Sequence, residues 1–101
     1  MKILCVCNHG NVRSVCLSRL LKDTRQHEAF AIGAQLFSDE SIKYLVEWSD
    51  KVFVMCEGEK DREKMKDLAK NKYVLFDVGI DRWFNPMHPE LIEIIKQKWQ
   101  Q

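Results

Sequence analysis

The sequence predicts an α/β fold: a single doubly wound domain with a four-stranded parallel sheet and helices on both faces. The first observation is a continuous apolar run at residues 3–6, typical of a strand buried on both faces. The second is that short apolar runs alternate with longer segments of helical periodicity. The third is the length of 101 residues, which corresponds to one domain over residues 1–101. Helical crossovers between the strands make the sheet parallel.

The first half of the chain contains two predicted strands and two helices. After the strand at residues 3–6, apolar residues recur at helical spacing and predict a helix over roughly residues 13–26. A second strand is predicted at residues 29–34. Ser38, followed by two acidic residues, is a typical N-cap and predicts the start of the second helix.

The second half repeats this alternation. A third strand is predicted at residues 51–55, of which 52–55 are apolar, and the strongly charged segment 57–70 is predicted to be a surface helix. A fourth strand is predicted at residues 73–76 and a loop at residues 77–87. Pro89 suits the first turn of a last helix. That helix is expected to bury four apolar residues: Leu91, Ile92, Ile95 and Trp99.

Composition excludes several classes of function. The formal net charge is +1 and the basic residues are not clustered, so we expect no nucleic-acid partner. The apolar run near the N-terminus is too short for a signal peptide or a membrane span, so we expect a cytoplasmic protein without a membrane partner. Three of the four cysteines lie within the first 16 residues, which in a cytosolic chain favours catalysis or burial over a disulfide framework.

Residues 7–14 carry the candidate chemistry, because they follow the first strand and precede the first helix. In doubly wound sheets, ligands bind beyond the C-terminal ends of the strands, where the strand order reverses. The positive end of a helix favours the thiolate form of Cys7, which is the nucleophilic form. Arg13 has a planar guanidinium that fits two phosphate oxygens, and the Ser14 hydroxyl can donate to the thiolate.

The backbone between these residues completes a predicted phosphate site. Successive amides in such a loop can surround the oxygens of a phosphate group. Gly10 permits the tight backbone turn that this requires. The expected phosphate-binding residues are Asn8, His9, Gly10, Asn11, Val12 and Arg13.

With Cys-x5-Arg-Ser placed between a first strand and a first helix, the chain resembles the low-molecular-weight protein tyrosine phosphatase family, and within it a small branch of predicted phosphatases. The resemblance extends over nearly the whole chain, including the segments 48–55 and 77–91. It implies that Cys7 is the nucleophile, Arg13 the phosphate binder and Ser14 the thiolate partner. The chain departs from the family at Gly10, where an Asn usually braces the loop, and at Val12, where a second Cys is common.

The resemblance also implies a general acid late in the chain, often in an Asp-Pro pair that this sequence lacks. Asp81 is the first candidate, and Asp77 is the alternative. The neighbouring Trp83 and Phe84 are candidate aromatic walls for a phenyl ring. The expected function is hydrolysis of phosphotyrosine, in a phosphorylated protein, or of a similar aryl phosphate monoester through a phosphocysteine intermediate.

Other functions of the same motif stay open. One alternative is a phosphate-binding module without turnover, and another is a thiol-dependent arsenate reductase. A third is a phosphocysteine carrier, against which Arg13 argues. Cys5 or Cys16 could form a redox disulfide with Cys7, although both are also typical core residues. Thiolate chemistry requires no metal or cofactor, so none is expected, and the sequence does not indicate the oligomeric state.

Overall fold

The computed structural model describes residues 1–24 and 26–99 and confirms the predicted alternation of strands and helices. The strands are β1 (Lys2–Cys7), β2 (Glu28–Gly33), β3 (Lys51–Val54) and β4 (Tyr73–Leu75). The helices are α1 (Arg13–Asp23), α2 (Asp39–Trp48), α3 (Glu59–Ala69) and α4 (Pro89–Trp99), with the 3-10 turn η1 (Lys70–Lys72) before β4.

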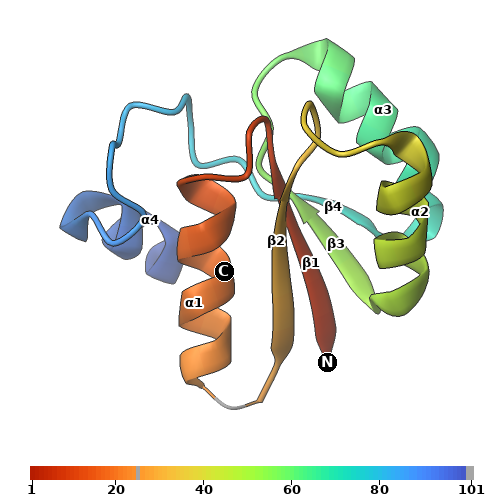
Figure 1. Ribbon diagram of the computed structural model, residues 1–101. Helices are drawn as coiled ribbons and strands as arrows, with labels where there is room; N and C mark the ends of the chain where they lie inside the picture. The colour runs from red at the N-terminus through yellow and green to blue at the C-terminus, as the bar shows by residue number, and fades with distance from the viewer. Residues whose placement is uncertain (25, 100–101) are drawn as a thin grey trace.

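The four strands form one parallel sheet in the order β2-β1-β3-β4. The chain moves from β1 to one side for β2 and then crosses to the other side for β3. The strand order therefore reverses between β1 and β3, where ligands bind in folds of this class. The loop after β1 starts at this point, as the sequence predicts (Figure 1).

Two hydrophobic clusters cover the two faces of the sheet. On one face, Ile3, Cys5 and Cys7 of β1 pack with buried residues of α1 and α4. On the other face, Leu4 and Val6 pack with buried residues of α2 and α3. Figure 1 shows α1 and α4 on one side of the sheet and α2 and α3 on the other. This alternation explains why residues 3–6 are apolar without interruption.

The helix ends follow the local sequence closely. The Ser38 hydroxyl accepts a hydrogen bond from the Ser41 amide, which confirms the predicted N-cap of α2. By contrast, α1 begins at Arg13, and its N-cap residue Val12 provides no side-chain capping hydrogen bond among the described residues. Its first-turn amides thus stay free for another acceptor. Leu91 and Ile95 of α4 are buried as predicted, whereas Ile92 is only partly buried. The expectation for Trp99 is wrong, because it is 37% exposed.

In the described ranges, 1–24 and 26–99, no helix is both long enough and apolar enough to cross a membrane.

Candidate active site

The Cys7 thiol lies at the C-terminal end of β1, directly before the loop of residues 8–12. Its Sγ atom is 3.1 Å from the backbone nitrogen of Gly10, which donates a hydrogen bond to it. The same sulfur is 3.1 Å from Ser14 Oγ, in the first turn of α1. A thiolate at this position would receive both donors. The structure thus brings Cys7, Gly10 and Ser14 together as the sequence predicts.

Gly10 adopts a left-handed backbone conformation, with φ +76°, and this turns its amide toward the sulfur. The loop also lies directly on the end of β2. A Cβ atom on Gly33 would lie 2.4 Å from the carbonyl carbon of His9, and one on Gly10 would lie 2.6 Å from the nitrogen of Gly33. Both positions must therefore be glycine for the loop to close against the sheet. The sequence analysis identified the requirement at Gly10 but not at Gly33.

Arg13 is the largest fully buried side chain in the described part of the chain, with 1% of its surface exposed. Its Nη1 donates to the carbonyl oxygens of Met55 (3.1 Å) and Gly79 (3.0 Å). Its Nη2 donates to Asn8 Oδ1 (3.0 Å) and lies 3.9 Å from the Glu57 carboxylate. Among the described residues, its Nε has no acceptor. A buried guanidinium N–H without a partner is costly, so this group is available to a bound acceptor.

The remaining predicted phosphate-binding residues line the same loop. Asn8 and Val12 are buried, whereas His9 and Asn11 are exposed. Within the part of the chain that the structure describes, the amides of Asn11 and Val12 donate no hydrogen bond. Free amides at a helix N-terminus favour an anion there.

The 77–88 loop carries both candidate acids and is joined to Arg13 through the Gly79 carbonyl. Asp77 Oδ1 accepts a hydrogen bond from the Gly79 amide, and Asp77 Oδ2 pairs with Arg62 at 3.3 Å. The Gly79 hydrogen bond and the nearby Arg62 guanidinium hold the pKa of Asp77 below its ordinary value. Asp77 is therefore a poor proton donor at neutral pH. Asp81 is exposed, two residues beyond Gly79, and takes no part in the hydrogen bonds and ion pairs of the described residues.

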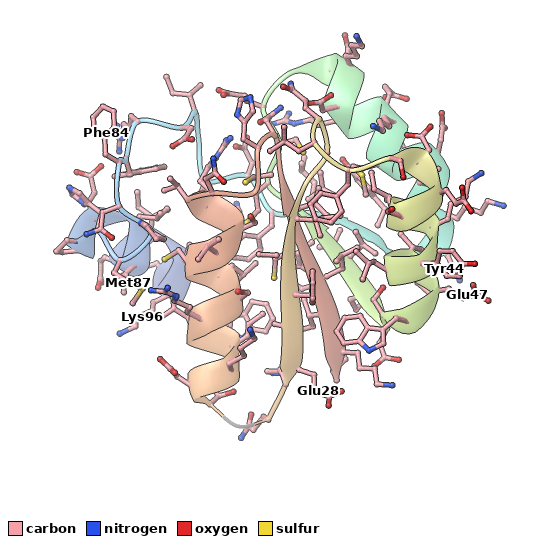
Figure 2. The ribbon with its side chains drawn as sticks, viewed as in Figure 1. Glu28, Tyr44, Glu47, Phe84, Met87 and Lys96 are labelled. Carbon is pink, nitrogen blue, oxygen red and sulfur yellow. The ribbon has the colours of Figure 1, made fainter. Side chains whose placement is uncertain are left out.

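The two proposed aromatic walls have different positions. Trp83 is 5% exposed and belongs to the hydrophobic core that contains α1 and α4. Its ring packs against the loop from inside, and its small exposed part lines a shallow hollow with Arg82, His88 and Glu90. The wall role of Trp83 stays a prediction. Phe84 is fully exposed, and Figure 2 shows it at the outer edge of this loop.

All four cysteines are buried and free, and Cys7 differs from the other three in having the Gly10 amide and the Ser14 hydroxyl beside its sulfur. Burial raises the pKa of the Cys5 thiol to about 12 and the pKa of the Cys16 thiol to about 11. Burial also raises the pKa of Cys56 to about 12. A protonated, inaccessible thiol is a poor nucleophile, so these side chains have the properties of core residues.

Two acidic residues near Arg13 were missed by the sequence analysis: Glu57 and Asp61. Asp61 is only 7% exposed, and its carboxylate contacts Asn8. A signal for its burial exists in the sequence, because Asp61, Met65 and Ala69 share one stripe of α3 at spacings of four residues. The carboxylate takes the place of an apolar residue in that stripe.

Comparison with known proteins supports the fold. A solved structure of the YwlE arginine phosphatase, a cysteine-to-serine mutant with a phosphorylated active-site serine, is similar to this chain with a TM-score of 0.67. The alignment covers 99% of this chain and 95% of that chain, at 16% sequence identity. At this identity the comparison establishes a shared fold. No protein-family model and no curated protein sequence matches the chain.

Proposed function

We propose that this chain is a cysteine-dependent phosphatase of the low-molecular-weight protein tyrosine phosphatase family, acting on phosphate monoesters. The main observation behind this proposal is the arrangement of side chains at the junction of β1 and α1. There the Cys7 sulfur meets the Gly10 amide and the Ser14 hydroxyl, and the buried Arg13 Nε has no partner within residues 1–24 and 26–99. This combination suits a thiolate nucleophile beside a bound phosphoryl group. The shared fold with an arginine phosphatase supports the same conclusion.

In the first step, the Cys7 thiolate attacks phosphorus and the bond between phosphorus and the leaving oxygen breaks. The loop amides and Arg13 hold the phosphoryl oxygens, where charge concentrates in the transition state. Asp81, in its protonated form, gives its proton to the leaving oxygen. The products of this step are the free alcohol or phenol and a phosphocysteine at Cys7.

In the second step, water attacks the phosphocysteine while the Asp81 carboxylate accepts a proton from that water. The sulfur–phosphorus bond breaks, inorganic phosphate leaves and the thiolate is restored. The Ser14 hydroxyl and the Gly10 amide, each 3.1 Å from the sulfur, stabilise the returning negative charge. Both donors therefore act most strongly on the sulfur as a leaving group.

The substrate class that we propose first is phosphotyrosine or a similar aryl phosphate, free or within a protein. A second candidate is phosphoarginine, the substrate type named for the similar solved structure. The observation that favours it is the Glu57 carboxylate, 42% exposed and close to Arg13, which could face a guanidinium leaving group. Arsenate reduction is less well supported, because the buried Cys16 has a pKa of about 11 and is poorly suited to resolve an intermediate.

The test is hydrolysis of para-nitrophenyl phosphate, phosphotyrosine and phosphoarginine by the wild type, Cys7→Ser and the control Cys16→Ala. We expect turnover by the wild type and the control and none by Cys7→Ser. Mass spectrometry of acid-quenched wild-type enzyme should find one phosphoryl group on the peptide that contains Cys7. Phosphate binding without release of product from any substrate would instead identify a binding module.

A further inference from the structure

Asp61 is a buried carboxylate that the proposed reaction does not use. It lies on α3 and is 7% exposed. Its Oδ2 accepts hydrogen bonds from Asn8 Nδ2 at 2.7 Å and from Gln35 Nε2 at 2.8 Å. A buried carboxylate is costly unless donors satisfy it, and these two come from two different loops. One oxygen therefore ties α3 to the phosphate loop and to the turn after β2.

The Asn8 carboxamide passes this contact on to Arg13. Its Nδ2 donates to Asp61 and to the Glu57 carbonyl oxygen at 2.9 Å. Its Oδ1 accepts from the Glu57 amide at 2.9 Å and from Arg13 Nη2 at 3.0 Å. All the hydrogen-bonding positions of the carboxamide are thus occupied. Because Asn8 Nδ2 faces Asp61, only Asn8 Oδ1 can face the Arg13 guanidinium. The negative charge of Asp61 polarises the Asn8 carboxamide further.

We infer that Asp61 and Asn8 are positioning residues that hold the Arg13 guanidinium in its phosphate-binding place. This inference rests on the proposed function, in which Arg13 binds the transferred phosphoryl group. In the family that this chain resembles, an Asn at the position of Gly10 braces the loop. Here Asn8, held by Asp61, takes that role. Arg13 is a long side chain with many rotamers, and fixed acceptors reduce the entropy lost when it binds an anion.

The test measures alkylation of Cys7 by anionic iodoacetate and by neutral iodoacetamide, together with hydrolysis of para-nitrophenyl phosphate. The variants are Asn8→Ala, Asp61→Asn, Asp61→Ala and the double variant Asn8→Ala/Asp61→Ala. Asp67→Asn, an exposed carboxylate on the same helix, is the matched control. Circular dichroism and thermal melting establish that each variant is folded. A further variant, Gln35→Ala, removes the second hydrogen-bond donor to the Asp61 carboxylate.

We expect the ratio of iodoacetate to iodoacetamide rates to fall about fivefold or more in Asn8→Ala and Asp61→Ala, because the positive charge of Arg13 is no longer held in one place. Asp61→Asn and Gln35→Ala should show smaller losses. kcat should fall about tenfold or more in Asn8→Ala and Asp61→Ala, with a smaller change in KM. The double variant should lose no more than the worse single variant, because the two residues act as one unit. Asp67→Asn should match the wild type.

An unchanged reagent ratio in folded Asp61→Ala, or fully additive losses in the double variant, would overturn the inference. The alkylation arm does not depend on turnover. If the wild type hydrolyses no phosphate ester but the reagent ratios change as expected, the positioning pair stands and the proposed function fails. If the wild type is active and the reagent ratios do not change, the proposed function stands and the positioning pair fails.

Discussion

The Arg13 guanidinium donates a hydrogen bond to the Gly79 carbonyl oxygen, 3.0 Å away, and so joins the proposed phosphate-binding loop of residues 8–12 to the loop that carries Asp81. These residues are 66 positions apart in the chain. One side chain therefore contacts both the predicted phosphate-binding residue Asn8 and the segment that carries the proposed acid. A substitution of Arg13 should affect both parts of the site at once.

Arg13→Lys should lower kcat/KM for para-nitrophenyl phosphate by about 100-fold or more, because misplaced contacts at a reacting centre can cost that much. A single ammonium group cannot reproduce the planar fork that reaches Met55, Gly79 and Asn8. The thermal midpoint should also fall. Steady-state kinetics and thermal melting measure the two effects. Arg19→Lys, an exposed position on the same helix, should change neither, and wild-type kinetics in Arg13→Lys would contradict our account.

Asp81→Asn should lower kcat for an alkyl phosphate by about 100-fold, the usual contribution of a general acid, and remove the alkaline limb of the pH–rate profile. That limb arises because the acid must start protonated. Asp77→Asn should retain the limb, since the Gly79 amide and Arg62 hold the pKa of Asp77 low. The measurement is kcat against pH for both variants. Retention of the limb in Asp81→Asn alone would refute the assignment of the acid.

Asp77 should instead influence stability. A carboxyl group whose pKa is lowered by folding stabilises the protein above its unfolded pKa, and this contribution is lost as pH falls through the folded value. Asp77→Asn should therefore unfold more easily than the wild type at neutral pH. The difference should shrink as the pH falls below 3.8, the ordinary value for Asp. Urea unfolding at several pH values measures it, and a constant difference would exclude this role.

Gly33→Ala should destabilise the protein by about 2 kcal/mol and reduce activity, because overpacking against backbone cannot be relieved by a rotamer change. The added Cβ would lie 2.4 Å from the His9 carbonyl carbon. Gly58→Ala is the comparison: it has φ +85° but open space around the Cβ, and should cost about 1 kcal/mol from backbone strain. Urea unfolding gives both values. Equal costs would show that the loop yields to the added methyl group.

The buried thiols should make the protein sensitive to alkali. Burial raises the pKa of Cys5 and Cys56 from 9.0 to about 12, so both are neutral in the folded state. Their contribution to stability is present below pH 9 and lost as the pH rises toward 12. Thermal melting between pH 8 and 11 should show this decline. Alkylation of the native protein at pH 8 should modify Cys7 before Cys5 or Cys56, because the latter two have raised pKa values and the Cys7 sulfur has two hydrogen-bonding partners. Equal modification of all three would contradict this account.

Most of the fold could be predicted from sequence because its signals are local. The apolar run of β1, the Ser38 cap and the proline at the start of α4 depend on neighbouring residues only. The positions of Cys7, Gly10 and Ser14 could be predicted for the same reason, since one short loop brings them together. The burial of Trp83 could not be predicted from sequence, because an aromatic residue in a loop can face either the core or solvent.

By itself, the sequence determined the α/β alternation and the placement of Cys7 and Arg13 on either side of the turn between β1 and α1. Only the tertiary structure decided what holds Arg13: the Met55 and Gly79 carbonyl oxygens and, through Asn8, the carboxylate of Asp61. Those acceptors come from segments that are distant in the chain. Their positions depend on how strands and helices pack, and a spacing pattern carries no information about contacts of that kind.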